Sequence, residues 1–545
     1  MWLGVLAVSV LIARVTSEVV APWWTNAVYY RILIDSFKDG DGDGLGDLQG
    51  ATQQISYVRA FGTDAVILSP FCAMNTDCTK PGPVNLIEID QRYGNLDKLT
   101  ALLTKAKNLE LKVVVTIPLQ TMSIESEWFT SSANRDSGYE DWILWKNGSG
   151  EDTPTEKDAV DKWVWHEKRG AFWASSNNAA VLNLCSEGVV AALSAALCAW
   201  LRRGAAGVLL NPDFPPNQAC GEKLLSKLAT EAMSCARAAN LDTPLILVES
   251  SLPSSEAAKY YSDSGVGANS VISNALTSTT RKSAAEWAIE FHAALLYSSD
   301  DFYPSWLTSS EDGNRIATRY GSDVIDAINL IALTLPGAAV IQQGDELGVA
   351  DTMLEWASSS DKCWPTPARP SAAPFPWEDS TNAGFTSGEP WLPLAPNYRY
   401  ANAKSEYSND LSHIAVVKTA AAMRKSPAMG PHTEIKRLGE AIAILRWGGA
   451  GILLVVSNLA KVQTEAEISK YAGLPHEMIV AASSTGSAFT TGSHVNLEKS
   501  LKLASGETVL LVGGPRHCGG PGPVDKIANK LSEGWQKINK YFSNL

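Results

Sequence analysis

The sequence predicts an α/β protein: a parallel (β/α)8 TIM barrel with a subdomain inserted after the third strand and an antiparallel β-sandwich near the C-terminal end. The barrel is predicted by short apolar runs that alternate with longer helical stretches. Strands are expected over 27–34, 64–69, 111–116 and 245–249, and helices over 48–61 and 96–108. The barrel is expected to span 18–121 and 179–407, and the sandwich 408–514.

The stretch 203–214 identifies the expected functional end of the barrel. Small residues precede a three-residue apolar run, and polar residues including Asn211 and Asp213 follow it directly. Such a run is typical of a strand buried on both faces of a parallel sheet, and barrel enzymes carry their chemistry at the carboxyl ends of these strands. We therefore expect a cleft beside Asn211.

A polar, tryptophan-rich segment over about 122–178 separates the third and fourth strands and is too long for an ordinary connection. This predicts an inserted subdomain. Its indole rings could stack on sugars or other flat ligands, but the segment has few other large apolar groups, so most of the rings are expected to pack its interior. The rings are those of Trp128, Trp142, Trp145, Trp163, Trp165 and Trp173.

From about residue 408 the pattern changes to short alternating runs, at 441–447, 452–456 and 508–512, which predict the β-sandwich. A Gly/Pro-rich linker and a strongly amphipathic helix are expected over 515–545. The helix carries one apolar stripe at spacings of three and four, formed by Ile527, Leu531, Trp535, Ile538, Phe542 and Leu545. It could dock on its own chain, bind a partner or a second copy, or lie on a membrane surface.

The overall charge disfavours one class of partner. The formal net charge is −13, whereas nucleic-acid binding needs a basic surface.

Residues 1–13 form a short apolar run followed by small residues, so 1–17 is interpreted as a cleaved secretory signal peptide. About a dozen apolar residues are too few for a bilayer that needs ~20, and no later stretch is long enough, so no transmembrane segment is expected. The expected location is extracellular.

The chain has eight cysteines, which in a secreted protein permit disulfides. The pairing of Cys72 with Cys78 is favoured, because it closes a short loop after a strand. Cys198 lies inside an apolar helical run, where a buried thiol is expected. Asn147 opens a glycosylation sequon in a polar segment suited to a surface loop.

Residues 39–47 alternate aspartate with glycine. Several carboxylates on a flexible backbone can converge on a hard cation such as calcium. A run of this composition is also typical of a solvated turn. The residues alone leave both interpretations open.

The sequence between residues 315 and 400 closely resembles that of the maltase-type α-glucosidases of the α-amylase superfamily. The heavy subunits of amino-acid transporters are relatives of these enzymes. The motifs are those at 315–321, 333–340, 344–348, 376–385 and 391–394. The resemblance covers about 22–512 and implies the barrel, the inserted subdomain and the sandwich. It also implies that the acidic run binds calcium, through the side chains of Asp39, Asp41, Asp43 and Asp47 and the carbonyl of Leu45.

The same resemblance implies a degenerate catalytic set. The family ends its fourth strand with Gly-Phe-Arg-x-Asp, and the matching frame places Leu209 at the arginine and Asn211 at the nucleophile. Glu249 stands at the acid/base position. Asp312 stands at the position of the transition-state-stabilising aspartate, and Glu311 replaces a histidine before it.

The third strand is altered as well, with Thr116, Gln120 and Thr121 in place of the family's Asp, Asn and His. The expected pocket therefore comprises Thr121, Leu209, Asn211, Glu249, Glu311 and Asp312.

A retaining glycosidase needs a carboxylate nucleophile and a second carboxyl group as acid/base, and a neutral amide cannot replace the first. Loss of a nucleophile costs on the order of 10⁴ to 10⁶ in rate. The sequence therefore predicts a secreted, catalytically inactive α-glucosidase-like protein that binds a ligand or assembles with a partner. Two alternatives stay open: an active α-glucosidase in which Asp213 attacks, and a heavy-subunit-like partner of a membrane transporter.

Overall fold

The computed structural model describes residues 21–149, 161–213, 220–261, 267–298, 303–357 and 364–516. The expected signal peptide, Cys363, Cys518 and the expected C-terminal helix lie outside these residues. None of the helices in the described ranges combines the length and apolar character needed to cross a membrane.

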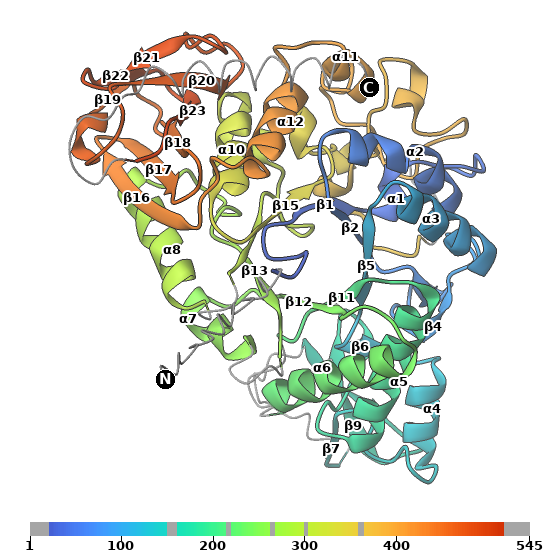
Figure 1. The fold of residues 1–545 in the computed structure, drawn as a ribbon. Helices are drawn as coiled ribbons and strands as arrows, with labels where there is room; N and C mark the ends of the chain where they lie inside the picture. The colour runs from blue at the N-terminus through green and yellow to red at the C-terminus, as the bar shows by residue number, and fades with distance from the viewer. Residues whose placement is uncertain are drawn as a thin grey trace, which may run out of the picture.

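Eight parallel strands close into a barrel, which confirms the predicted fold class (Figure 1). The ring closes because β1 pairs with both β2 and β15. Side chains such as those of Tyr29, Leu209 and Leu247 fill its interior. In chain order the strands are β1 (Val28–Ile32), β2 (Ala65–Leu68), β5 (Lys112–Ile117), β11 (Gly207–Leu210), β12 (Leu245–Glu249), β13 (Ser270–Ser273), β14 (Ser305–Leu307) and β15 (Ala338–Gln342).

Helices surround this ring, and several begin at side-chain caps of the kind that satisfy free backbone N–H groups. Asp47 caps α2, Asn95 caps α3, and Ser283 with Glu286 forms a capping box on α8. The α-helices are α1 (Ile34–Phe37), α2 (Leu48–Ala60), α3 (Leu96–Asn108), α5 (Glu187–Arg203), α6 (Gly221–Ala238), α7 (Ser254–Ala257), α8 (Ala284–Leu296), α9 (Ile316–Tyr320), α10 (Ile325–Thr334), α11 (Ala403–Tyr407) and α12 (His413–Arg424). The short 3₁₀ turns are η1 (Ala258–Tyr260), η2 (Ser322–Val324), η3 (Asp345–Leu347), η4 (Leu354–Trp356), η5 (Pro370–Ala372), η6 (Thr381–Gly384) and η7 (Ile468–Lys470).

The segment between β5 and β11 forms a separate small sheet in the order β6-β10-β9-β7, with β8 paired to β9. Most of its tryptophans pack its interior as expected: the Trp128 and Trp142 rings lie 4.9 Å apart, and Trp173 packs on Phe129. The elements are β6 (Thr121–Met122), α4 (Glu127–Asn134), β7 (Trp145–Asn147), β8 (Lys162–His166), β9 (Ala171–Ser176) and β10 (Ala179–Val181). A hairpin of β3 (Cys72–Met74) and β4 (Pro83–Ile89) precedes it.

The C-terminal part is a six-stranded antiparallel sheet, ordered β16-β17-β18-β23-β20-β21, with the ribbon β19-β22 beside it. Ala466 of the ribbon and Leu454 of the sheet share one apolar core, as expected for a sandwich. The strands are β16 (His432–Leu438), β17 (Ala441–Trp447), β18 (Ile452–Ser457), β19 (Thr464–Ala466), β20 (Glu477–Ser483), β21 (His494–Asn496), β22 (Leu501–Leu503) and β23 (Thr508–Gly513).

Two buried arginines join this sheet and α12 to the barrel. The carbonyls at the C-terminal end of a helix lack partners within the helix and attract cations. At the end of α10, Arg424 donates to the carbonyl of Leu333 at 2.7 Å, and Arg446 donates to that of Thr334 at 2.8 Å. Burial lowers the pKa of Arg424 to about 9 and that of Arg446 to about 10.

The cysteine expectations need correction. Cys72 is a free, buried thiol, whereas Cys78 forms a disulfide elsewhere, because Cys72 faces the interior and Cys78 lies in an exposed loop. Cys198 is not a free thiol: α5 and α6 pack side by side and place it 5.8 Å from Cys235, Cα to Cα, as a disulfide. Cys185 and Cys220 form another disulfide at 5.3 Å.

Candidate functional site

A buried ion pair crosses the barrel at the carboxyl ends of its strands. Arg31 on β1 binds Glu249, the last residue of β12, through both terminal nitrogens: Nη1 donates to Oε1 at 2.9 Å and Nη2 donates to Oε2. The two side chains are 3% and 19% exposed. A bidentate contact of this kind is both strong and directional. It therefore holds the predicted acid/base carboxylate in one position.

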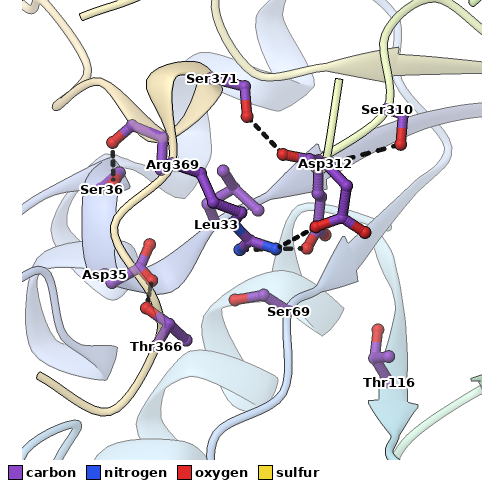
Figure 2. Close-up of polar contacts among 12 residues, drawn as sticks. Leu33, Asp35, Ser36, Ser69, Thr116, Ser310, Asp312, Thr366, Arg369 and Ser371 are labelled. Atoms are coloured by element: carbon purple, nitrogen blue, oxygen red, sulfur yellow. Dashed lines mark hydrogen bonds and ion pairs between the residues drawn. The ribbon is translucent and has the colours of Figure 1, made fainter. Parts of the chain in front are cut away.

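Two further acidic side chains and a second arginine extend this pair into a cluster. Oε1 of Glu311 lies 2.8 Å from Nε of Arg31, and its Oε2 lies 3.5 Å from Arg369. Arg369 also donates to Asp312 at 3.0 Å, as Figure 2 shows. We call Arg31, Glu249, Glu311, Asp312 and Arg369 the cleft ion cluster.

Burial and ion pairing have different net effects on the charged forms of Arg31 and Glu311. Burial by itself would lower the pKa of Arg31, but the carboxylates of Glu249 and Glu311 outweigh it and hold that pKa above its ordinary value. Burial raises the pKa of Glu311 even though two arginines oppose the shift. Asp312 differs from the others because its side chain is 85% exposed. It therefore lies at the rim of the cluster.

A second buried carboxyl group lies close by on α1. Asp35 accepts a hydrogen bond from Thr366, and the two residues lie on the opposite side of Figure 2 from Asp312. Burial raises the pKa of Asp35, and Arg369 partly offsets that shift. The positive charge of Arg369 thus acts on Asp35 as well as on Glu311.

The end of β11 supplies no carboxylate to this cluster. Leu210 on β11 pairs with Val248 on the adjacent strand β12. Asn211 and Glu249 are the next residues along these two segments, so they lie side by side at the strand ends. The side-chain amide oxygen of Asn211 accepts from the side-chain amide of Gln120 at 3.3 Å and from the backbone N–H of Asp213 at 3.1 Å. The amide therefore stabilises the turn that leaves β11.

Asp213 serves the same turn rather than the cluster. Its carboxylate accepts from the Ser250 hydroxyl at 2.7 Å, and from the backbone and hydroxyl of Ser251. The Tyr260 hydroxyl lies 3.4 Å away. These contacts join the chain after β11 to the chain after β12 and engage both carboxylate oxygens.

The structure brings together three of the six predicted pocket residues, Glu249, Glu311 and Asp312, with Asn211 on the neighbouring strand end. One expectation is corrected. Leu209 is 1% exposed inside the barrel and offers no surface to a ligand, because its side chain points inward below the strand ends. Thr121 is half-buried and pairs with Val181 in the small inserted sheet, and its place in the pocket stays a prediction.

Sequence reasoning missed both arginines of the cluster. The available signal for Arg31 was a charged residue inside an apolar strand, since a fully buried charge requires a partner. Arg369 precedes η5 in a segment without regular periodicity, so no local pattern identified it. The buried side chain of Gln343 accepts a hydrogen bond from the backbone N–H of Leu33 at 2.8 Å. The sequence position of Gln343 did not predict this contact.

The acidic run forms a compact carboxylate group. Oxygen atoms of Asp39, Asp41 and Asp43 lie within 4.8 Å of one another. Gly44 has a positive φ of 101°, and a Cβ there would lie 2.1 Å from the Glu389 carbonyl, so glycine is required for this tight loop. Asp47 instead caps α2 through Gly50 and also accepts from Gly40 at 3.0 Å. The oxygen donors suit a hard cation, and a bound calcium would hold this loop in place.

The predicted glycosylation residue lies at a strand end. Asn147 is the last residue of β7 and is exposed. Its side chain is accordingly on the surface of the inserted subdomain.

An eight-stranded parallel barrel with an appended antiparallel sheet, and with acidic side chains gathered at the carboxyl ends of its strands, defines a TIM-barrel protein whose candidate site lies where barrel enzymes carry their chemistry. The chain belongs to the α-amylase family: the model for the alpha amylase catalytic domain matches residues 31–211 and 227–430.

Its relatives include insect sugar-cleaving enzymes. The chain is 29% identical over 515 residues to Maltase 1 of Drosophila virilis, covering 84% of this chain and 81% of the relative. It is 26% identical over 495 residues to the salivary alpha-glucosidase of Aedes aegypti, covering 80% and 85%. Among solved structures, the trehalulose synthase MutB from Pseudomonas mesoacidophila has a TM-score of 0.76 at 20% identity, covering 90% of this chain and 99% of that one. That likeness concerns the fold.

Proposed function

We propose that this chain is a secreted α-glucosidase-like protein that does not hydrolyse glycosides and acts by binding a ligand or a protein partner. The observation that supports it is the contact of Arg31 with both carboxylate oxygens of Glu249. A retaining mechanism requires a carboxyl group that reaches the leaving oxygen of the substrate. The bidentate pair holds this carboxyl group against Arg31, so turning it toward a leaving oxygen requires the ion pair to open.

Asn211 supports the proposal independently. The nucleophile in this mechanism forms a covalent bond to the sugar, and an amide at the end of β11 cannot do so. The alternative nucleophile, Asp213, has both oxygens engaged by Ser250 and Ser251. The carboxyl groups that remain in the cluster are therefore left without an attacking partner.

Three further features belong to the proposal. Secretion is supported by the similarity to salivary alpha-glucosidases and by the disulfides of the described chain. Calcium is proposed as a structural ion of the loop at Asp39, Asp41 and Asp43, and glycosylation is proposed at Asn147. The ligand or partner that such a protein binds is to be identified by experiment.

The second candidate function is an active α-glucosidase. The names of the relatives favour it over the binding role, since the curated relatives described above are a maltase and an alpha-glucosidase. A heavy-subunit-like role beside a membrane transporter is a third proposal, and it predicts purification together with a polytopic membrane protein.

The deciding experiment is hydrolysis of p-nitrophenyl α-glucoside and maltose, in the presence of calcium, by wild type, Glu249→Gln and Asn211→Asp. We expect wild type and Glu249→Gln to stay at background. Because Arg31 still holds Glu249 in Asn211→Asp, that variant is expected to show at most trace activity. Wild-type turnover at ordinary maltase rates that is lost in Glu249→Gln would establish the second candidate instead.

Binding can be assayed without knowing the ligand. A molecule that binds only the folded state raises the melting temperature by mass action. We expect a panel of mono- and disaccharides and apolar dyes to contain at least one such molecule. A panel without any shift, together with no protein that purifies with the native chain, would count against a binding role.

A further inference from the structure

The outer face of α8 exposes apolar side chains that the described part of the chain does not cover. Ile289 is 67% exposed and Leu296 is 76% exposed, and Tyr297 after them is 43% exposed. Seven residues make two helical turns, so Ile289 and Leu296 lie on the same face. The opposite face is buried against the barrel through Trp287, Phe291 and Ala294. We call Ile289, Leu296 and Tyr297 the α8 stripe.

The described chain ends beside this helix. Arg516 donates to the Ala472 carbonyl at 2.8 Å, lies 3.0 Å from Glu434 on β16, and stacks 4.5 Å above the ring of Trp447 on β17. Both strands pack against α8, which runs along the same edge of the molecule in Figure 1. The chain beyond residue 516 therefore starts at strands that pack against α8.

The remaining chain has a matching apolar surface and sufficient length. Residues 517–523 can span about 23 Å when extended. Residues 524–545 would form a helix of roughly 33 Å, longer than the roughly 20 Å of α8. The expected apolar stripe of this tail includes Leu531, Trp535 and Ile538.

Charge favours the same arrangement. The tail 524–545 has four lysines and two acidic residues, in a chain whose net charge is −13. Helix α8 has Glu286 and Glu290 but neither lysine nor arginine; Glu290 pairs with Lys282 just before the helix, and Glu286 accepts from Ser283 at its N-terminus. Electrostatic attraction to the basic tail is therefore a small addition to apolar burial.

We propose that the tail 524–545 docks as a helix on the α8 stripe of its own chain and covers Ile289 and Leu296. Docking there hides the apolar face of the tail, so recruitment of another protein by that face first requires release from α8.

The test is hydrogen–deuterium exchange of the full-length protein with peptide resolution over 524–545. We expect amides in this region to exchange at least 10-fold more slowly than in an unstructured chain, equally at micromolar and nanomolar protein concentration. In Ile289→Gln with Leu296→Gln we expect this protection to fall at least 10-fold. Glutamine keeps the helix propensity of α8 and replaces only exposed groups, so an unchanged melting transition of the barrel checks the fold.

The matched control is Leu411→Gln, which changes an 81% exposed leucine before α12, outside the α8 stripe. We expect it to leave the protection of the tail unchanged. Several results would overturn the proposal: an unprotected tail, protection that survives the double substitution, or protection lost in Leu411→Gln instead. Protection that disappears on dilution would indicate a second copy as the occupant, and protection seen only with phosphatidylserine vesicles would indicate a membrane; either result also overturns it.

Discussion

Arg31 and Glu249 lie 218 residues apart in the sequence and meet across the barrel as a bidentate ion pair. Glu311 contacts the remaining side of the same guanidinium. One arginine on β1 therefore binds both Glu249, which is predicted to stand at the acid/base position, and Glu311, which is predicted to replace a pocket histidine. This relationship connects the fold to the proposed loss of hydrolysis.

Arg31→Met should destabilise the protein by about 3 to 5 kcal/mol at pH 7.5, because it removes the bidentate partner of Glu249 and leaves Glu311 with Arg369 alone. The measurement is urea unfolding followed by fluorescence. The control is Arg437→Met, which removes an exposed ion pair with Glu440 and should cost about 1 kcal/mol or less. A loss in Arg31→Met no larger than in this control would show that the ion pair does not hold the cleft.

Glu346 should make stability depend on pH in an unusual direction. It is buried, and burial raises its pKa from 4.5 to about 7, although Tyr30 and Tyr57 donate to it and lower the pKa in part. The folded state therefore binds this proton more tightly than the unfolded state, so the free energy of unfolding decreases as pH rises from about 4.5 through 7. The expected contribution is on the order of 2 to 3 kcal/mol.

Unfolding in urea from pH 4.5 to 8 checks this dependence. In Glu346→Gln the decrease between pH 5 and 8 should be smaller, while the remaining decrease reflects other buried carboxyl groups such as Glu311 and Asp35. Glu440→Gln, at a side chain that is 41% exposed, is the control and should keep the wild-type slope. Parallel curves for wild type and Glu346→Gln would contradict the assignment.

Asp213→Asn should lower stability by about 1 to 3 kcal/mol, because the carboxylate accepts hydrogen bonds from Ser250 and Ser251 that an amide cannot fully accept. Asp242→Asn, at a 91% exposed aspartate paired with Lys112, should change stability by less than about 0.5 kcal/mol. Both are measured by urea unfolding. Equal losses of stability in the two variants would contradict a structural role for Asp213. Asp213 would then again be a candidate nucleophile.

Calcium should stabilise the protein if the loop at Asp39, Asp41 and Asp43 binds it. At a free concentration of 100 times Kd, the gain is about 2.7 kcal/mol, seen as a higher melting temperature that chelation reverses. Asp41→Asn with Asp43→Asn should abolish the calcium-dependent part. Asp410→Asn, an exposed aspartate elsewhere, should retain it. A melting temperature that does not change with calcium would contradict calcium binding and favour a solvated turn at residues 39–47.

The sequence by itself determined the barrel, the inserted subdomain and the C-terminal sandwich. Strand and helix periods are local properties, so the expected strand 245–249 matches β12 (Leu245–Glu249) in full. It also determined that an amide, Asn211, follows β11, because residue identity needs no structure. The acidic side chains Glu249 and Asp312 were located in the same way, from motif positions.

Only the tertiary structure decided which side chains meet. Barrel closure brings Arg31 to Glu249, and the packing of α5 on α6 brings Cys198 to Cys235. Neither pair has a signal in local spacing, since hydrogen bonds and ion pairs act over a few ångströms between segments that are distant in the chain. For the same reason the sequence could not predict the hydrogen bonds of Asp213. The chain after β12 brings Ser250 and Ser251 to its carboxylate only in the folded barrel.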